Sequence, residues 1–306
     1  MNVNDSKGEV SADVNLTEWM ETRRFEIERT LSERLPPADT RPRVVHEAMR
    51  YACMNGGKRL RGLLVLGFCE LFGAPRQRAL KPAAALEAFH ASTLVHDDLP
   101  CMDDDDLRRG KPSTHIQFGE ANALLAGNGL LTLALGWMAE TPVPPPHPPG
   151  ILATELARAG GSEGVIGGQI EDLEAETVPG DEGKLIYIHT EKTARLIACA
   201  CRTGAICGGA CAFKVERAGS FGLHLGLAFQ ILDDILDCTQ SSEKLGKPAK
   251  SDQERGKLTS VSLWGLEGSR ERAALYTRQA LDTLDQFNHP TAALKALTRW
   301  LLNREG

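Results

Sequence analysis

The segment AAALEAFHASTLVHDDLPCMDDDD, from Ala83 to Asp106, joins an apolar helical run to a block of aspartates. Acidic blocks are usually solvated surface, but carboxylates are costly to hold near an apolar core without a partner. Three basic residues, Arg108, Arg109 and Lys111, follow the aspartates at once. Because Mg²⁺ prefers carboxylate oxygens and commonly takes phosphate oxygens as further ligands, the segment indicates a magnesium-bound phosphate ester at the end of a helix.

The rest of the chain also shows helical patterns. Leu16 to Leu35 has apolar residues at helical spacing and stops before two prolines, and further helices are expected from Val44, Phe118, Ile151, Lys184 and Ala218. The proline-rich stretch from Thr141 to Gly150 is expected to be an exposed loop, since proline cannot continue a helix. Strand alternation and solenoid-length repeats are absent from the sequence. We therefore predict an all-α, single-domain helical bundle over residues 1–306.

The composition excludes some classes of protein. The chain has 306 residues, 42% of them hydrophobic and 25% charged, as in ordinary globular proteins. Its net charge of −6 argues against nucleic-acid binding, which needs a basic face. The amino terminus lacks the pattern of a signal peptide, and we find no stretch of roughly 18 apolar residues that would indicate a membrane span. We expect a cytoplasmic protein with no membrane span.

A second acidic segment, FQILDDILD, runs from Phe229 to Asp237. On a helix, Gln230, Asp233, Asp234 and Asp237 fall within a stripe of about 100°, and apolar residues cover the other side. No basic residue stands four positions after any of the three aspartates, so ion pairs along the helix surface do not explain them. The carboxylates are expected to converge on one point.

The first acidic segment is arranged differently. Pro100 biases Leu99 away from helical geometry, so the helix is expected to end there. Asp97 then lies in the last turn, and the following bend brings Asp103 back to it. Two carboxylates roughly 6 Å apart repel by about 3 kcal/mol at an effective dielectric constant of 20, so the pair needs a cation. Two such segments facing each other predict a site for several metal ions.

With these motifs the chain resembles the trans-prenyl diphosphate synthases, the family of farnesyl and geranylgeranyl diphosphate synthases. The resemblance runs from Gly56 to Lys257 and leaves out the first forty residues. Its motifs, in order, are GGKRLR at Gly56, DDLPCMD followed by RRGKP, GGQIED at Gly167, EKT at Glu191, and FQ before DDILD. The resemblance implies an isoprenoid synthase bundle around a deep central cavity, Mg²⁺ as cofactor with three ions per site, and a homodimer.

The resemblance also implies a role for individual residues. The metal ligands would be the aspartates of both motifs, Asp97, Asp98, Asp103, Asp233, Asp234 and Asp237. The diphosphate of the allylic substrate would be neutralised by Arg108, Lys192, Lys247 and Lys257. Isopentenyl diphosphate would bind in a metal-free basic pocket made by Lys58, Arg61, His90 and Arg109. The catalytic residues would be Lys192, Thr193 and Gln230, and of these Thr193 and Gln230 would face the developing cation.

The implied reaction condenses isopentenyl diphosphate with dimethylallyl, geranyl or farnesyl diphosphate. Ionisation, condensation and proton loss give farnesyl or geranylgeranyl diphosphate. A class I terpene cyclase and a phosphohydrolase are alternatives, but a cyclase has no use for the basic residues Lys58, Arg61 and Arg109. A non-catalytic synthase subunit is a third, and it would be expected to lack one of the acidic motifs.

Three residues that precede the first acidic motif in the sequence are candidates for setting the length of the product. Phe89, Ser92 and Thr93 share a stripe about 140° wide with Asp97, so they are expected to line the cavity for the growing chain. Farnesyl synthases usually have an aromatic residue five positions before the first aspartate, where this chain has Ser92. Phe89 lies roughly 4.5 Å lower, about one isoprene unit. We therefore expect geranylgeranyl diphosphate at least in part, with farnesyl diphosphate as the alternative.

Overall fold

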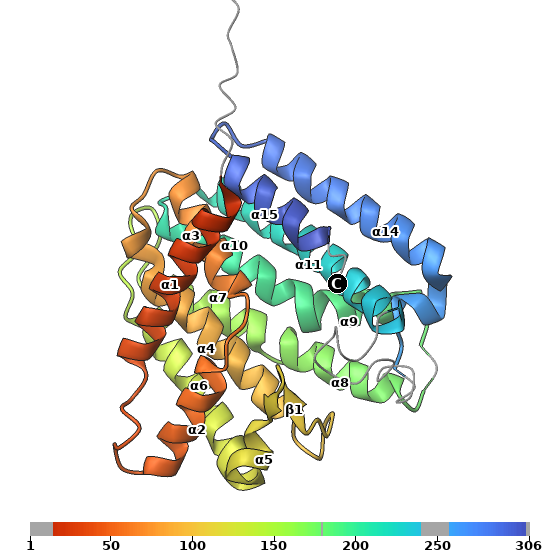
Figure 1. Ribbon diagram of the computed structural model, residues 1–306. Coiled ribbons are helices and arrows are strands. Elements are labelled where there is room, and N and C mark those ends of the chain that lie inside the picture. Colours follow the sequence, from red (N-terminus) through yellow and green to blue (C-terminus); the bar gives the residue numbers. More distant parts are fainter. Residues whose placement is uncertain (1–14, 179, 240–256, 304–306) are drawn as a thin grey trace, which may run out of the picture.

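The computed structural model describes residues 15–178, 180–239 and 257–303, and helices make up most of it. The first half contains α1 (Leu16–Arg34), α2 (Arg43–Met54), α3 (Leu60–Leu71), η1 (Arg76–Ala79), α4 (Leu80–Asp97), α5 (Thr114–Phe118) and α6 (Glu120–Ala139). The second half contains α7 (Ile151–Gly160), α8 (Val165–Ala175), α9 (Glu182–Ile188), η2 (His189–Ala194), α10 (Arg195–Cys207), α11 (Ala212–Thr239), α14 (Ser260–Asp285) and α15 (Ala292–Leu302). The prediction of an all-α fold is confirmed (Figure 1).

Most predicted boundaries agree with the structure, with three exceptions. Helix α11 begins at Ala212, six residues before the expected start, because its first turns are charged and exposed and carry little apolar pattern. The segment from His189 to Ala194 is a π-helical turn, which sequence periodicity does not reveal. A short hairpin pairs β1 (Leu107–Arg108) with β2 (Lys111–Pro112). The hairpin turns the chain just after the first acidic motif.

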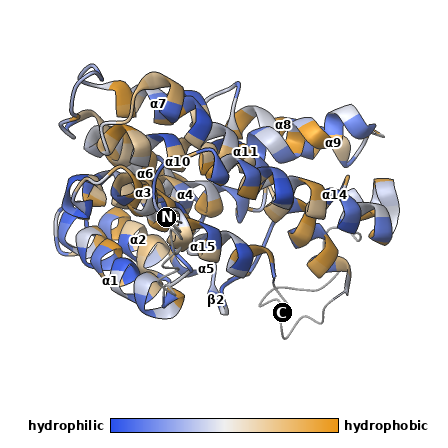
Figure 2. Cartoon of the chain, turned by 90° about the horizontal axis from the view of Figure 1, so that it is seen from above, coloured by the Kyte–Doolittle hydropathy of each residue, from blue (hydrophilic) through white to orange (hydrophobic). Residues whose placement is uncertain are grey.

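The core is formed where α3, α4, α6, α7, α10 and α11 meet. Its largest fully buried side chains include Phe68, Leu86 and Phe221. Small residues let the central helices approach closely, since a Cβ on Gly204 would lie 2.4 Å from the backbone oxygen of Val65. Outer helices such as α1 and α14 carry both hydrophilic and hydrophobic residues (Figure 2). The packed centre provides a rigid support for the helix ends that form the site.

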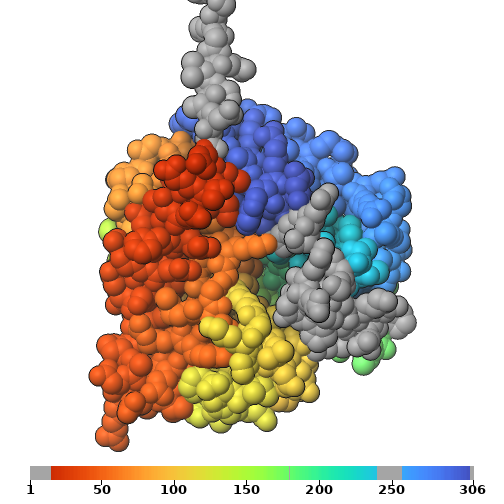
Figure 3. Space-filling model, viewed as in Figure 1, coloured from red at the N-terminus to blue at the C-terminus, as the bar shows by residue number. Residues whose placement is uncertain are grey.

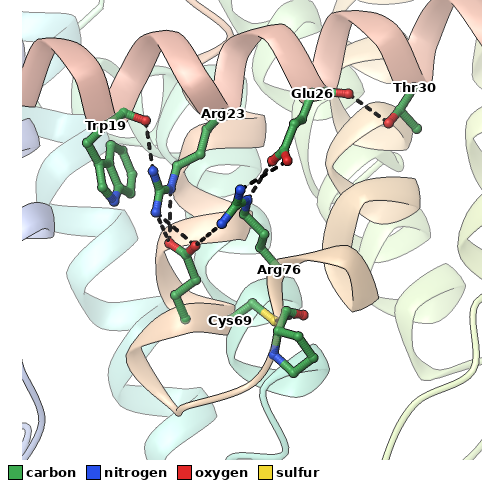
Figure 4. A network of polar contacts seen from close by, with 8 residues as sticks. Trp19, Arg23, Glu26, Thr30, Cys69 and Arg76 are labelled. Atoms are coloured by element: carbon green, nitrogen blue, oxygen red, sulfur yellow. Dashed lines mark hydrogen bonds and ion pairs between the residues drawn. The ribbon is translucent and has the colours of Figure 1, made fainter.

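Helix α1 lies in the amino-terminal part of the chain that resembles no family motif, yet polar contacts tie it to the bundle (Figure 4). Arg23 donates to Glu70 of α3 at 2.8 Å and to the backbone oxygen of Trp19 at 3.0 Å. Arg76 of η1 donates to Glu26 at 2.6 Å. The buried residues Ile27 and Leu31 extend the same contact into the core. Helix α1 is therefore part of the folded unit.

Helix α6 is the one helix in the described residues that is long and apolar enough, by length and composition, to cross a membrane. It packs along α4 and against α2. Such a helix on its own is weak evidence for a span, so the structure implies none.

Candidate active site

One cavity collects most of the predicted acidic residues. It lies between the ends of α4 and α8, the turn η2, α11 and the residues just before α14. Asp97 ends α4, and the backbone N–H of Asp103 donates to the backbone oxygen of Asp97 at 2.8 Å. The predicted bend after Leu99 thus returns Asp103 to the end of the helix. Asp233 of α11 lines the same cavity.

The wall opposite α4 carries the predicted catalytic residues. Thr193 in the π-turn donates its hydroxyl to Oε1 of Gln230 on α11 at 2.8 Å. A Cβ on Gly168 of α8 would lie 2.3 Å from the backbone nitrogen of Lys192, so only glycine permits α8 to approach the π-turn this closely. All three of the predicted catalytic residues line the cavity.

Two lysines bridge the walls of this cavity. Lys192 Nζ lies 2.6 Å from Oδ2 of Asp172, and Lys257 Nζ lies 2.8 Å from Oδ1 of Asp103 and 3.8 Å from Oδ2 of Asp172. Both ammonium groups therefore stand where a diphosphate would need positive charge. Asp172 was missed as a site residue, although it belongs to the GGQIED motif. Asp172 lies four residues after Gly168 on α8, so both face the same side of the helix, and this spacing could have marked it as a site residue.

Burial shapes the electrostatics of the first motif. It raises the pKa of Asp97 to about 6; nearby Lys192 opposes the rise, and Asp103 adds to it. A raised carboxyl pKa means that the negative charge is poorly stabilised by the protein alone. A cation bound at this position would stabilise it. The electrostatics thus fit the predicted need for a cation.

Asp98 is placed differently from the prediction that it binds metal directly. Its side chain is 2% exposed and faces Arg108, whose Nε donates to Oδ1 of Asp98 at 2.9 Å. Arg108 also donates to Asp105 at 3.1 Å. The guanidinium lines the carboxylate cavity while it is held by these two aspartates. Asp98 therefore positions Arg108, and the pair explains why two adjacent aspartates differ in role.

Asp234 and Asp237 are buried, whereas Asp233 is half-buried. Asp234 accepts hydrogen bonds from the backbone of Ser260 at 2.7 Å and from Nε2 of Gln230 at 3.0 Å, and it lies 3.3 Å from Nε2 of His189. Burial would raise the pKa of Asp234, but His189 and these donors hold it below its ordinary value. Asp237 is only 4% exposed and lies outside the lining of the cavity. Of the three aspartates on α11, Asp233 and Asp234 line the cavity, and their role as metal ligands stays a prediction.

The predicted basic pocket forms a second cavity. Lys58, Arg61, His90 and Arg109 all line it, from the loop before α3, from α3, from α4 and from the hairpin, respectively. Burial lowers the pKa of Arg61 to about 10, and Nε of Arg61 is buried without a hydrogen-bond partner among the described residues. Burial and the neighbouring guanidiniums also hold the pKa of His90 well below its usual value. The cavity presents positively charged side chains whose charge a bound anion would neutralise. Two further charged residues, Arg59 and Glu87, also line it and are not among the predicted site residues.

The rim of this basic cavity meets the carboxy-terminal helix. Lys58 Nζ lies 5.3 Å from the ring centroid of Trp300 on α15, a distance at which a cation is attracted to an aromatic face. The loop before α3 and α15 come together on the face seen in Figure 3. Helix α15 therefore helps to hold the loop that carries Lys58.

The remaining predicted residues can be placed as follows. Phe89 is buried, and a Cβ on Gly160 of α7 would lie 2.2 Å from its ring, so the two are in tight contact. Ser92 is 1% exposed and donates to the backbone oxygen of Phe89 at 2.6 Å. Thr93 is half-buried and donates to the backbone oxygen of His90 at 2.8 Å. Their role in product length stays a prediction. Lys247 lies outside the described residues.

The donor set fits magnesium better than a transition metal. Within the described part of the chain, no three acidic, histidine or cysteine side chains form a complete metal cluster. Mg²⁺ usually binds one or two carboxylates and keeps water and substrate phosphate oxygens in its other positions. Asp97, Asp103 and Asp233 around one cavity match that pattern. These residues would hold the ions, together with the diphosphate.

A helical bundle with a carboxylate cavity and a basic cavity, both lined in part by α4, matches the isoprenoid synthase class that the sequence motifs predict. Comparison with known families agrees, since residues 42–295 match the polyprenyl synthetase model. The chain belongs to the polyprenyl synthetase family and is a prenyltransferase.

Individual relatives support the same assignment. Geranylgeranyl pyrophosphate synthase 12 of Arabidopsis thaliana is 43% identical over 284 residues, which cover 91% of this chain and 78% of the relative. A geranylfarnesyl diphosphate synthase of Leucosceptrum canum is also 43% identical, over 91% of this chain and 78% of its own. These names fit the synthase and not the cyclase or the non-catalytic subunit.

Solved structures show the same fold. An FPP/GFPP synthase from Zymomonas mobilis is 39% identical, with a TM-score of 0.82 over 94% of this chain and 99% of the other. A geranyltransferase from Helicobacter pylori, complexed with magnesium and isoprenyl diphosphate, is 30% identical, with a TM-score of 0.79 over 93% of this chain and 96% of the other. The second structure supports magnesium and prenyl diphosphates as ligands of this fold.

The expectation of a cytoplasmic location is wrong. Relatives from Arabidopsis thaliana and Capsicum annuum are described as chloroplastic, which contradicts the expectation. The sequence reasoning relied on the absence of a secretory signal, and that absence does not distinguish the cytoplasm from a plastid.

Proposed function

We propose that the chain is a short-chain trans-prenyltransferase that condenses isopentenyl diphosphate with an allylic diphosphate to form farnesyl or geranylgeranyl diphosphate. The observation that carries the proposal is the pair of cavities: one has carboxylates on two walls, and the other is lined by basic residues. A cyclase or a phosphohydrolase acts on one diphosphate and would need only the first. We also propose that residues 1–306 form a single domain, because one hydrophobic core joins the helices of the first and second halves.

The residues divide the work of the reaction between them. Bound magnesium, for which we propose three ions, would supply Lewis-acid stabilisation of the leaving diphosphate. Lys192 and Lys257 place ammonium groups at the same cavity and neutralise charge that accumulates as the carbon–oxygen bond breaks. Gln230 is held by Thr193 and Asp234, so its amide dipole is fixed before the allylic cation forms. The basic cavity holds isopentenyl diphosphate so that its double bond lies near this cation, and the released diphosphate accepts the proton.

The test is an incubation of the purified chain with magnesium, isopentenyl diphosphate and each allylic diphosphate in turn, followed by sizing of the products. Condensation that requires both substrates supports the proposal. Cyclised hydrocarbon formed without isopentenyl diphosphate would indicate a cyclase, and free prenyl alcohol with no longer product would indicate a phosphohydrolase. Either outcome contradicts the proposal.

Ser92→Phe is predicted to shorten the main product by one isoprene unit. Ser92 lies on α4 one turn above Phe89, and its side chain is buried, so a phenyl ring would fill space that the growing chain needs. Chromatography of the products after removal of the diphosphate measures the effect. Ser92→Ala, which removes only the hydroxyl, should leave the product length unchanged. If Ser92→Phe gives the wild-type product length, Ser92 does not set the floor of the cavity.

We also propose a homodimer that forms through α6. The helix exposes Leu124 and Leu125, the latter 57% exposed, and Leu131 on it is only partly buried. A row of apolar side chains of this kind on one helix is typical of an interface between subunits. Leu125→Glu is predicted to shift the protein from dimer to monomer, measured by light scattering after size exclusion. Leu275→Glu, on the exposed face of α14, is the control and should leave the mass unchanged. A monomeric wild type would contradict the proposal.

A further inference from the structure

Glu87 is a buried carboxylate in a cavity that otherwise collects positive charge. It lies on α4, three residues before His90, and it is 4% exposed. Among the described residues that line the basic cavity, Glu87 is the one with a carboxylate side chain. Four of the other lining residues, Lys58, Arg59, Arg61 and Arg109, are basic. An acidic residue opposes the binding of an anion, so its presence in this cavity needs an explanation.

The first role of Glu87 is at the start of α3. Its Oε1 accepts a hydrogen bond from the backbone N–H of Gly62 at 2.8 Å. Helix α3 begins at Leu60, and the residue before it, Arg59, has a left-handed backbone and provides no side-chain cap. The first N–H groups of a helix need acceptors, and negative charge is favoured there. Glu87 therefore caps α3 from a neighbouring helix and fixes the turn that carries Arg61.

The second role is electrostatic. Arg59 has its own acidic partner, Glu28, at 3.4 Å. Arg61 is half-buried and Arg109 is more exposed. Desolvation lowers the pKa of both guanidiniums, whereas the nearby charge of Glu87 raises the pKa of both. The hydrogen bond of Glu87 goes to the backbone of α3. Glu87 therefore acts on these guanidiniums through the electrostatic field of its charge and, for Arg61, by fixing the helix turn that carries it.

We propose that Glu87 is the resident counter-ion of the basic cavity: it stabilises the clustered guanidiniums before substrate binds and competes electrostatically with the incoming diphosphate. Glu87 is therefore a positioning residue: it keeps the pocket preformed and weakens the affinity of the pocket for the diphosphate. The inference rests on the proposed function, because it takes isopentenyl diphosphate as the anion. The carboxylate and the diphosphate neutralise the same cations, so their effects on stability and on binding are coupled.

The test compares Glu87→Gln with the wild type in EDTA, where isopentenyl diphosphate can occupy only a metal-free site. Glutamine keeps an oxygen that can accept from Gly62 and removes the charge. The unliganded variant should melt at a lower temperature, while its Kd for isopentenyl diphosphate, measured by calorimetry, should fall about 3- to 10-fold. A purely structural role would lower the melting temperature and leave Kd unchanged or raise it. Such a result would overturn the inference.

Two further measurements keep the test decisive. Glu155→Gln is the matched control: Glu155 is also buried and binds Arg202 at 2.5 Å, but it lines neither of the two cavities. Its loss should lower stability without changing Kd. If Glu87→Gln does not fold, Glu87→Asp, which retains the charge, should bind with the wild-type Kd, and a tenfold change in either direction would contradict the inference. Absence of binding to the wild type would instead contradict the proposed function.

Discussion

Asp233→Asn is expected to lower kcat/KM for the allylic substrate by about 10²- to 10³-fold, the loss typical when one group that stabilises transition-state charge is removed. Asp233 lines the carboxylate cavity from α11, facing the wall that carries Asp97 and Asp103. An asparagine of the same shape is a much weaker magnesium ligand. The concentration of Mg²⁺ that gives half-maximal activity should therefore also rise. Steady-state kinetics over a magnesium titration measure both effects.

Two aspartates serve as controls for that prediction. Asp104→Asn changes an exposed residue at positive φ, a conformation that asparagine tolerates, and it should leave the kinetics unchanged. Asp234→Asn weakens a buried set of hydrogen bonds to Ser260 and Gln230, so its main effect should be a lower melting temperature. If Asp233→Asn keeps the wild-type magnesium dependence, Asp233 is not a metal ligand.

Arg61→Gln is expected to raise the KM for isopentenyl diphosphate by about 10- to 100-fold, because a charge-assisted hydrogen bond contributes roughly 1.5–3 kcal/mol. The KM for the allylic diphosphate should change little, since Arg61 lines only the basic cavity. The measurement is a pair of titrations, each substrate varied while the other is saturating.

The control for Arg61 is an arginine outside both cavities. Arg29→Gln removes an exposed cation that pairs with Glu33 along α1, so it should leave both KM values unchanged. A rise in the allylic KM of Arg61→Gln, with no change for isopentenyl diphosphate, would show that the two substrates have been assigned to the wrong cavities.

The sequence predicted the fold well where local chemistry decides the structure. Pro36 ends α1, the prolines after Thr141 form a loop, and Pro100 ends α4 so that Asp103 returns to Asp97. The exact start of α11 and the π-turn at His189 depend on contacts between helices. Local patterns carry no information about such contacts.

The site was predictable only in part for the same reason. Periodicity places Asp233, Asp234 and Asp237 on one stripe, but it does not show that α14 begins against Asp234 and covers it. Likewise two adjacent aspartates look equivalent in the sequence until the hairpin brings Arg108 onto Asp98. Glu87 acts through a partner distant in the chain, so no local pattern marks it, whereas Asp172 is the last residue of the GGQIED motif.

The most direct test of the account is a crystal structure of the protein with Mn²⁺ in place of Mg²⁺ and a non-ionisable allylic diphosphate analogue. Anomalous scattering would locate the metal ions. We predict ions that contact the diphosphate and are bound by Asp97 and Asp103 on one side and by Asp233 on the other. Ions bound on one side only, or a diphosphate held by lysines and arginines with no metal between the two acidic motifs, would contradict the account.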